Sequence, residues 1–221
     1  MPNEVPNKEI KEVAFGAAFS PRFQLLDLWG EIADRILYDN KYFSTDMFPK
    51  ISSNYTIERR LYNPQNNNCF VLTSNNLVYV QPIEKDFIGE FNKFKKRVSE
   101  YIVPEILSKH SLVIRRLGVV YTCAWSDAEI QKFAGKFFLP TISNISDFRF
   151  SQKMGTVKGT LFSENSDFIN KIYTVGNVSE EIKGVMYDYQ QHYHPLRSDV
   201  RSEIGKVLSK SYDSFQEDVT T

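Results

Sequence analysis

The sequence has few cysteines, and the two it has suggest neither a disulfide framework nor a metal site. Cys69 and Cys123 fall in separate predicted strands, without the short spacing of zinc ligands. Reduced thiols in a cytoplasmic compartment explain them most simply. Neither has the sequence context of a catalytic nucleophile.

The chain also lacks an excess of charge and any long apolar run. Among 221 residues, 27 Lys and Arg balance 27 Asp and Glu, so no net positive field attracts nucleic acid, which would need a local patch. The first fifteen residues contain no signal-peptide pattern, and no later apolar run approaches the roughly 18 residues of a membrane span. We therefore expect a cytoplasmic protein with no membrane association, long enough to bury a sizeable core.

No nucleotide-binding loop or catalytic triad is evident. Gly155, Gly159 and Gly176 do not form a phosphate-cradling pattern between a strand and a helix. No Ser-His-Asp or Cys-His arrangement has a recognisable spacing. The sequence implies no cofactor, and it favours a non-catalytic protein over an enzyme.

Aromatic residues are abundant, at 14% of the chain, so the core should be rich in rings. Strands are expected over Val13 to Phe19, Tyr55 to Tyr62, Cys69 to Thr73, Leu77 to Ile83, Leu112 to Trp125, Asp147 to Met154, Thr156 to Ser163, Phe168 to Val175 and Lys183 to Tyr193. Helices should follow Ser20-Pro21, begin near Asp86, span Asp127 to Phe138 and begin at His194-Pro195. Adjacent strands flanked by helices predict an α+β fold with helices packed on one face of an antiparallel sheet.

The predicted elements divide into two halves of similar layout, packed as one unit. Residues 1–125 would form strand, helix, three strands, helix, strand, and residues 126–221 would form helix, four strands, helix. Ser126 and Glu129 have the spacing of a capping box, which satisfies the free backbone donors at a helix start. Pro104 should kink or end its helix, and Gly155 should form a hairpin turn.

The strand Leu112 to Trp125 is apolar on both faces yet contains Arg115 and Arg116. Strict alternation would place these two arginines on opposite faces of the sheet. A guanidinium there could hold a phosphate or carboxylate, with Tyr121 nearby as a further binding residue. The simpler alternative is an internal ion pair with an acid on a neighbouring strand; Glu12, Glu58 and Asp188 are the candidates.

A second candidate site is His192-Tyr193-His194. In a strand, both imidazoles would project to one side, together with Asp188 and Gln190. Two imidazoles and a carboxylate could bind zinc or transfer protons on RNA or a nucleotide. The same side could instead be a solvent-facing strand end.

Basic residues gather in two further places. Lys93, Lys95, Lys96 and Arg97 form a stripe on a predicted helix, which could contact nucleic acid or be an ordinary solvated face. Arg59 and Arg60 lie on a Tyr-containing strand that could be a recognition edge.

Arg116 to Tyr121 resembles the Arg-Leu-Gly-apolar-Arg-Tyr strand of a sporadically distributed prokaryotic family of uncharacterised proteins. Glu12 to Phe15 with Phe19, Tyr187 to Tyr189, and Ser211 to Val219 resemble that family's first strand, late strand and C-terminal helix. Val120 replaces the family's second arginine, and Asn7-Lys8 replaces its proline pair. The resemblance implies a prokaryotic origin and a role beside mobile or defence genes, with no established catalytic residues.

These observations favour a non-catalytic accessory or regulatory subunit that binds another macromolecule, with a protein subunit as the expected partner. The resemblance alone suggests anti-phage defence or a toxin–antitoxin-like pair. Two alternatives stay open: a small metal- or His-dependent hydrolase or RNA-processing enzyme that uses His192, His194 and Asp188, and a nucleic-acid-binding subunit.

Overall fold

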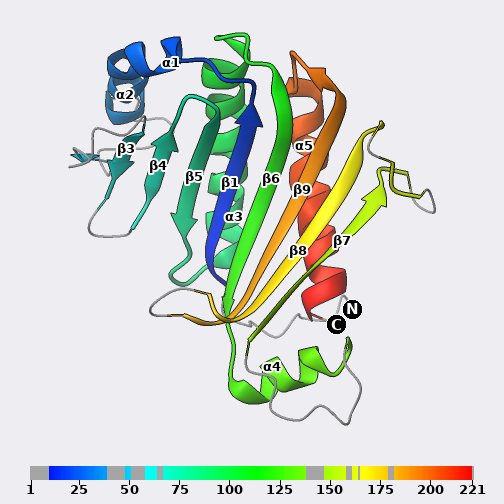
Figure 1. Ribbon diagram of the computed structural model, residues 1–221. Coiled ribbons are helices and arrows are strands. Elements are labelled where there is room, and N and C mark those ends of the chain that lie inside the picture. The colour runs from blue at the N-terminus through cyan, green and yellow to red at the C-terminus, as the bar shows by residue number, and fades with distance from the viewer. Residues whose placement is uncertain are drawn as a thin grey trace.

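The computed structural model describes residues 10–38, 48–50, 58–63, 67–137, 147–157, 161–163, 165–178 and 182–220. Nine strands form one sheet in the order β2-β3-β4-β5-β1-β6-β9-β8-β7, and every neighbouring pair is antiparallel (Figure 1). The strands are β1 (Ile10–Phe19), β2 (Phe48–Lys50), β3 (Arg59–Tyr62), β4 (Cys69–Leu72), β5 (Asn76–Pro82), β6 (Ile114–Ala124), β7 (Phe148–Gly155), β8 (Phe168–Asn177) and β9 (Lys183–Arg197).

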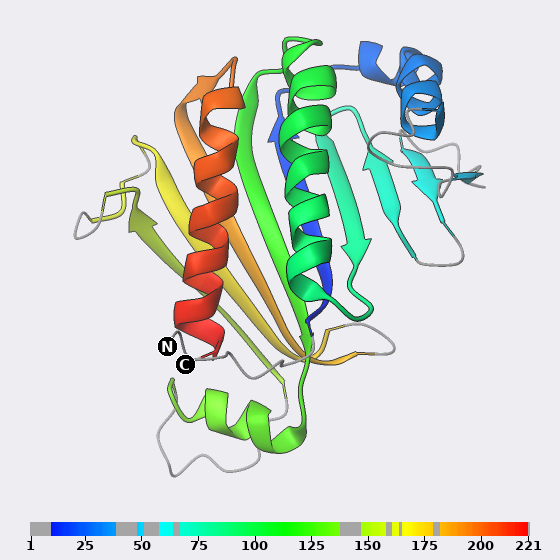
Figure 2. The same cartoon turned by 180° about the vertical axis from the view of Figure 1, so that it is seen from behind.

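Two long helical segments cover one face of this sheet, as Figure 2 shows. The first joins α3 (Phe87–Arg97) to the π-helix η2 (Val98–Ser108), and the second joins α5 (Arg201–Phe215) to the π-helical turn η3 (Gln216–Thr220). The shorter helices α1 (Gln24–Asp27), α2 (Trp29–Tyr38) and α4 (Asp127–Ala134) lie at the ends of the sheet. The predicted α+β fold, with helices on one face of an antiparallel sheet, is confirmed.

Alternation along the strands builds the core between the sheet and the long helices. Val13, Phe15 and Ala17 of β1 are buried, as are Leu117, Val119, Tyr121 and Cys123 of β6. Rings fill much of this layer: Tyr121 stacks on Phe215 of α5 with centroids 4.6 Å apart. The expected ring-rich core is therefore present.

The two halves of the chain use their elements in the same order. Strand β1 is followed by a short helical segment, an antiparallel meander ending in β5, and the helix α3; strand β6 is followed by α4, a meander ending in β9, and α5. The strands that begin the two sets, β1 and β6, pair with each other at the centre of the sheet. In this arrangement β6 opens the second set, whereas the predicted division after residue 125 places this strand in the first half.

Three local expectations are wrong. No strand forms among the described residues of 156–163; Gly155 instead ends β7 opposite Phe168 and makes no tight hairpin. Strand β9 continues through His194 and Pro195 to Arg197, so the last helix begins at Arg201. Pro195 lies in the irregular stretch of β9 between His192 and Arg197, where neither β6 nor β8 pairs with the strand, so no ladder hydrogen bond is lost there.

The other helix predictions had mixed outcomes. The helical segment does not end at Pro104: this residue lies inside η2, whose backbone hydrogen bonds continue past it to Lys109. Ser126 and Glu129 form the predicted capping box at the start of α4. Helix α4 ends at Ala134, short of the predicted end at Phe138, whereas the predicted strand start at Tyr55 lies outside the described residues.

Candidate binding face

The sheet has a second face, on which no described helix packs; we call it the open face (Figure 1). It carries the strand positions that alternate with the core. Cross-strand pairing places Gly16, Gly118, Gln190, Asn170 and Lys153 in one row across it. Side chains on this face therefore come from strands distant in sequence.

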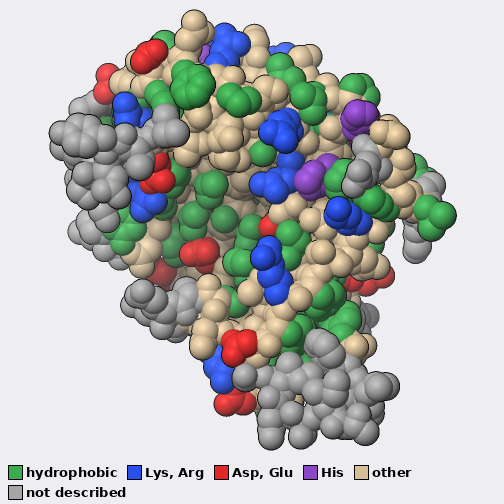
Figure 3. Space-filling view, in the orientation of Figure 1, with side chains coloured by type: hydrophobic (Ala, Val, Ile, Leu, Met, Phe, Trp, Pro, Cys, Tyr) green, Lys and Arg blue, Asp and Glu red, His purple; other side chains and the backbone are tan. Residues whose placement is uncertain are grey.

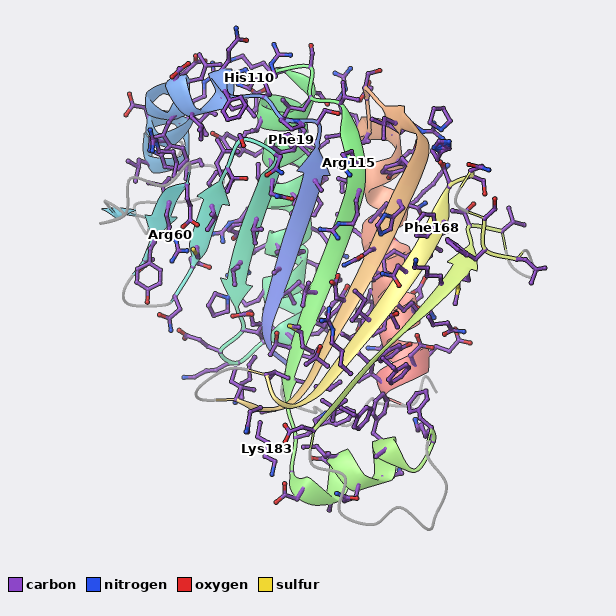
Figure 4. All side chains as sticks on the ribbon, in the orientation of Figure 1. Phe19, Arg60, His110, Arg115, Phe168 and Lys183 are labelled. Atoms are coloured by element: carbon purple, nitrogen blue, oxygen red, sulfur yellow. The ribbon has the colours of Figure 1, made fainter. Side chains whose placement is uncertain are left out.

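A β-bulge sets the direction of the two adjacent arginines. Ile114 pairs with Phe19 and Arg116 pairs with Ala18, which leaves Arg115 as the extra residue. Ile114 is buried in the core, whereas Arg115 is exposed and lies on the open face in Figure 4. The expectation that Arg115 and Arg116 diverge across the sheet is therefore wrong, because a bulge interrupts the alternation.

Four cations gather on this side of the sheet. Arg115 and Arg116 on β6 are joined by Arg149 and Lys153 of β7, at positions that alternate with the core-facing residues of that strand. Within the described part of the chain, none of the three arginines forms an ion pair or a hydrogen bond. Lys153 Nζ lies 4.9 Å from the Phe162 ring centroid and 5.9 Å from that of Phe168.

The three acids expected to neutralise Arg115 or Arg116 are engaged elsewhere. Glu12 accepts a hydrogen bond from Thr122 at 3.3 Å, and Glu58 pairs with Arg60 at 2.7 Å. Asp188 accepts from Gln190 at 2.5 Å. Among the ion pairs of the described residues, the predicted internal pair is absent.

Asp188 begins a chain of polar side chains along the centre of the open face. Gln190 donates to Asp188 through Nε2, and its Oε1 accepts from Asn170 Nδ2 at 3.2 Å. His192 Nε2 lies 3.1 Å from the same Gln190 oxygen. Asn170 is 9% exposed, and its Oδ1 is buried without a partner in the structure as described.

Burial controls the charge state of this chain. It raises the pKa of Asp188, and the Gln190 hydrogen bond and the nearby Arg116 and Arg149 oppose this effect. Burial, followed by the charges of Arg116, Lys153 and Arg115, lowers the pKa of His192 to about 4. His192 is therefore neutral at pH 7, so the positive charge of the face comes from the Arg and Lys side chains.

Beside these charges, the open face has a region of small and apolar side chains on β1, β5 and β4. Strand β1 contributes Ala14, Gly16 and Ala18, and a Cβ added at Gly16 would meet no atom within 4 Å. Beside them lie Val78 and Val80 of β5 and Val71 of β4, all half-buried. Figure 3 shows this face hollowed near its centre, with hydrophobic side chains on one side and Lys, Arg and His on the other.

The two regions can be named by their residues. The cationic half comprises Arg115, Arg116, Arg149 and Lys153 around the Asp188–Gln190–His192 chain. The apolar half comprises Ala14, Gly16, Ala18, Val71, Val78 and Val80.

Other predicted site residues lie elsewhere. Tyr121 is buried on the helix side, where its hydroxyl bonds Ser211 at 3.0 Å, so its predicted binding role is wrong. Arg60 lies on the open face at β3 but pairs with Glu58. Arg59, opposite Leu72, belongs to the alternating positions that face the helix layer, and it is exposed at the sheet edge.

The predicted basic stripe lies on the helical layer, away from the open face. Lys93 pairs with Glu90 at 2.7 Å, and Lys95 lies 5.0 Å from the Phe91 centroid. Arg97 donates to Tyr79 Oη at 2.7 Å, and Lys96 is exposed. Three of the four basic side chains thus contact a partner within the chain.

Of the two histidines in the predicted His-x-His pair, only His192 lies near the carboxylate of Asp188. Asp188 and His192 share the open face through Gln190, but His194 lies beyond the end of β8, exposed, with its backbone N–H bonded to Asp167. Searching the described ranges finds no group of three His, Cys, Asp or Glu side chains able to hold a metal ion. The predicted metal site gains no support from this geometry.

Sequence reasoning missed Arg149, Lys153 and Asn170. A signal for the first two was present: in Phe148 to Lys153, basic residues at 149 and 153 alternate with the aromatics Phe148 and Phe150. No such pattern marks Asn170, whose position depends on the register between β8 and β9.

Comparisons with protein-family models and with curated proteins gave no match. Among the described residues, no helix is long and apolar enough to cross a membrane. The resemblance to a sporadic prokaryotic family therefore stays a prediction from the motifs.

Proposed function

We propose that this chain is a non-catalytic binding protein that engages a negatively charged macromolecule through its open face. One observation carries the proposal: Arg115, Arg116, Arg149 and Lys153 form no ion pair with any described residue, and no described helix covers them. Because the chain has no net charge, this local excess is not a consequence of composition. An unpaired guanidinium can form bidentate, charge-assisted hydrogen bonds with the carboxylate or phosphate of an anionic ligand.

The sequence motifs favour a more specific version of this proposal, in which the chain is an accessory or regulatory subunit of a prokaryotic defence system. The alternative of a His-dependent hydrolase has weaker support. The His192 ring is stacked on Phe168 and bonded to Gln190, which leaves it poorly placed to exchange a proton with a substrate.

A salt titration of polyanion binding tests the proposal. Fluorescein-labelled 30-residue polyglutamate and 20-nucleotide RNA and DNA strands are measured by fluorescence anisotropy at two ionic strengths. Charge-assisted hydrogen bonds are worth about 1.5–3 kcal/mol each, so Arg115→Ala with Arg116→Ala should weaken binding at least about tenfold. Salt should weaken it as well.

Lys93→Ala with Lys96→Ala provides the matched control, since it removes the same charge from the helical layer. The proposal fails if none of the three polymers binds, or if both double variants weaken binding equally.

A further inference from the structure

We infer that the occupant of the open face is an acidic amphipathic helix of a protein partner. Its acidic side would lie over the cationic half, and its apolar side over the apolar half. This inference rests on the proposed function and specifies the ligand of the same face.

The width of the face supports a helix. Two strand spacings, from β5 across β1 to β6, amount to about 10 Å, close to the ~10–12 Å diameter of an α-helix. A helix lying over β1 would therefore contact Val78 and Val80 on one side and Arg115 and Arg116 on the other. Along β1 itself, Ala14, Gly16 and Ala18 leave space for the helix to approach the sheet.

The charge pattern supports an amphipathic ligand over a uniform polyanion. On the open face, the described residues of β4, β5 and β1 include no Lys or Arg, and Glu12 adds an acid there. A nucleic acid strand crossing this region would place phosphates over valines and alanines, without compensation. An acidic helix with an apolar stripe satisfies both halves at once.

Ring geometry also disfavours a nucleic acid. Bases bind single-stranded sites by stacking on accessible aromatic faces. Phe168, the aromatic residue within the cationic half, has His192 stacked on it at 4.3 Å and the edge of Phe162 at 4.9 Å. Lys153 lies near the same ring, so little of it is free for a base.

A random 16-residue peptide library displayed on phage provides an unbiased probe. Enriched peptides are synthesised and their affinities are measured by anisotropy alongside polyglutamate and the 20-nucleotide RNA. We expect enriched sequences that combine Asp and Glu with an apolar stripe at helical spacing, and a gain of helical circular dichroism on binding.

Two variants test the two halves. Arg115→Glu with Arg116→Glu reverses charge in the cationic half, and Gly16→Leu fills the apolar half at a site where an added Cβ meets no neighbour. Each should reduce peptide affinity at least tenfold. Lys93→Glu with Lys96→Glu, and Gly205→Leu on the exposed side of α5, are the matched controls and should leave affinity unchanged.

The outcomes separate the two claims. If polyglutamate or RNA binds through Arg115 and Arg116 while Gly16→Leu has no effect, the helix assignment is overturned and the proposed function stands. Enrichment of peptides without acidic residues overturns the assignment as well. If no probe depends on the two arginines, both claims fail. Thermal unfolding of each variant shows whether it still folds. If Gly16→Leu does not fold, the smaller substitution Gly16→Val takes its place in the affinity measurement.

Discussion

Phe168 and His192 lie face to face on neighbouring strands, with ring centroids 4.3 Å apart and planes 8° apart. Stacking on Phe168 and contact with Gln190 partly shield the imidazole from water, while Arg116, Lys153 and Arg115 place positive charge near it. A cationic face thus contains a histidine that stays neutral.

Titration of His192 followed by NMR should therefore give a midpoint near pH 4, below the ordinary value near 6.5. Because the unfolded chain binds this proton more readily, the His192 contribution to stability should fall as pH drops from about 6.5 to 4. Arg116→Ala should move the midpoint upward by removing a repulsive charge. A wild-type midpoint at or above 6 would contradict the described environment.

Two glycines on the open-face positions should respond oppositely to substitution. A Cβ at Gly184 would lie 1.8 Å from the Cys123 carbonyl oxygen, whereas one at Gly16 meets nothing within 4 Å. Gly184→Ala should cost about 3 kcal/mol or more, because backbone must move. Gly16→Ala should be neutral or stabilise by up to about 1 kcal/mol. Urea unfolding of the pair measures the difference, and equal midpoints would refute it.

Asp218 of η3 connects the C-terminal turn to the sheet. It accepts from Lys171 Nζ at 2.6 Å and from Tyr173 Oη at 2.7 Å, and Lys171 is 8% exposed. Asp218→Ala should destabilise the protein by about 3 kcal/mol, since it leaves a buried charge unpaired. Adding Lys171→Met should recover most of that loss. Denaturant unfolding of the single and double variants checks this, and a double variant as unstable as the single one would argue against the pair.

The capping box at α4 should make a modest local contribution. Ser126 Oγ accepts from the backbone N–H of Glu129, and the Glu129 carboxylate accepts from Ser126 N at 2.8 Å. Ser126→Ala should cost about 1 kcal/mol, while Ser126→Asp should retain most of the stability. Thermal unfolding distinguishes these, and an unchanged Ser126→Ala protein would show that α4 is held by packing alone.

Local signals in the sequence predicted the positions of most helices and strands but not how the strands pair. Periodicity located β1, β5 and β8 to within a few residues, and the Ser126 and Glu129 spacing identified the start of α4. The failures involve tertiary context. Phe162 packs against Phe168 without joining a ladder, so the apolar run around it resembles a strand without being one.

At the candidate site, too, local sequence patterns predicted some positions and failed where strand pairing decides them. Alternation correctly placed Asp188, Gln190 and His192 on one face. The direction of the Arg115 side chain depends on a β-bulge between β6 and its neighbouring strands. No residue type in this part of the sequence predicts that bulge. Arg149 and Lys153 join the cationic half only because β7 is added at the far edge of the sheet.

The pairing of β1 with β6 has a consequence for the order in which the chain acquires structure. Paired residues such as Phe15 and Val119 are separated by about a hundred residues in sequence, so the strand pairing at the centre of the sheet is also the one with the largest sequence separation. During synthesis β1 can pair with β5, yet its other edge stays unsatisfied until β6 has been made. Pairing β1 with β6 closes a long loop of chain, which costs conformational entropy. We therefore expect this step to limit the folding rate.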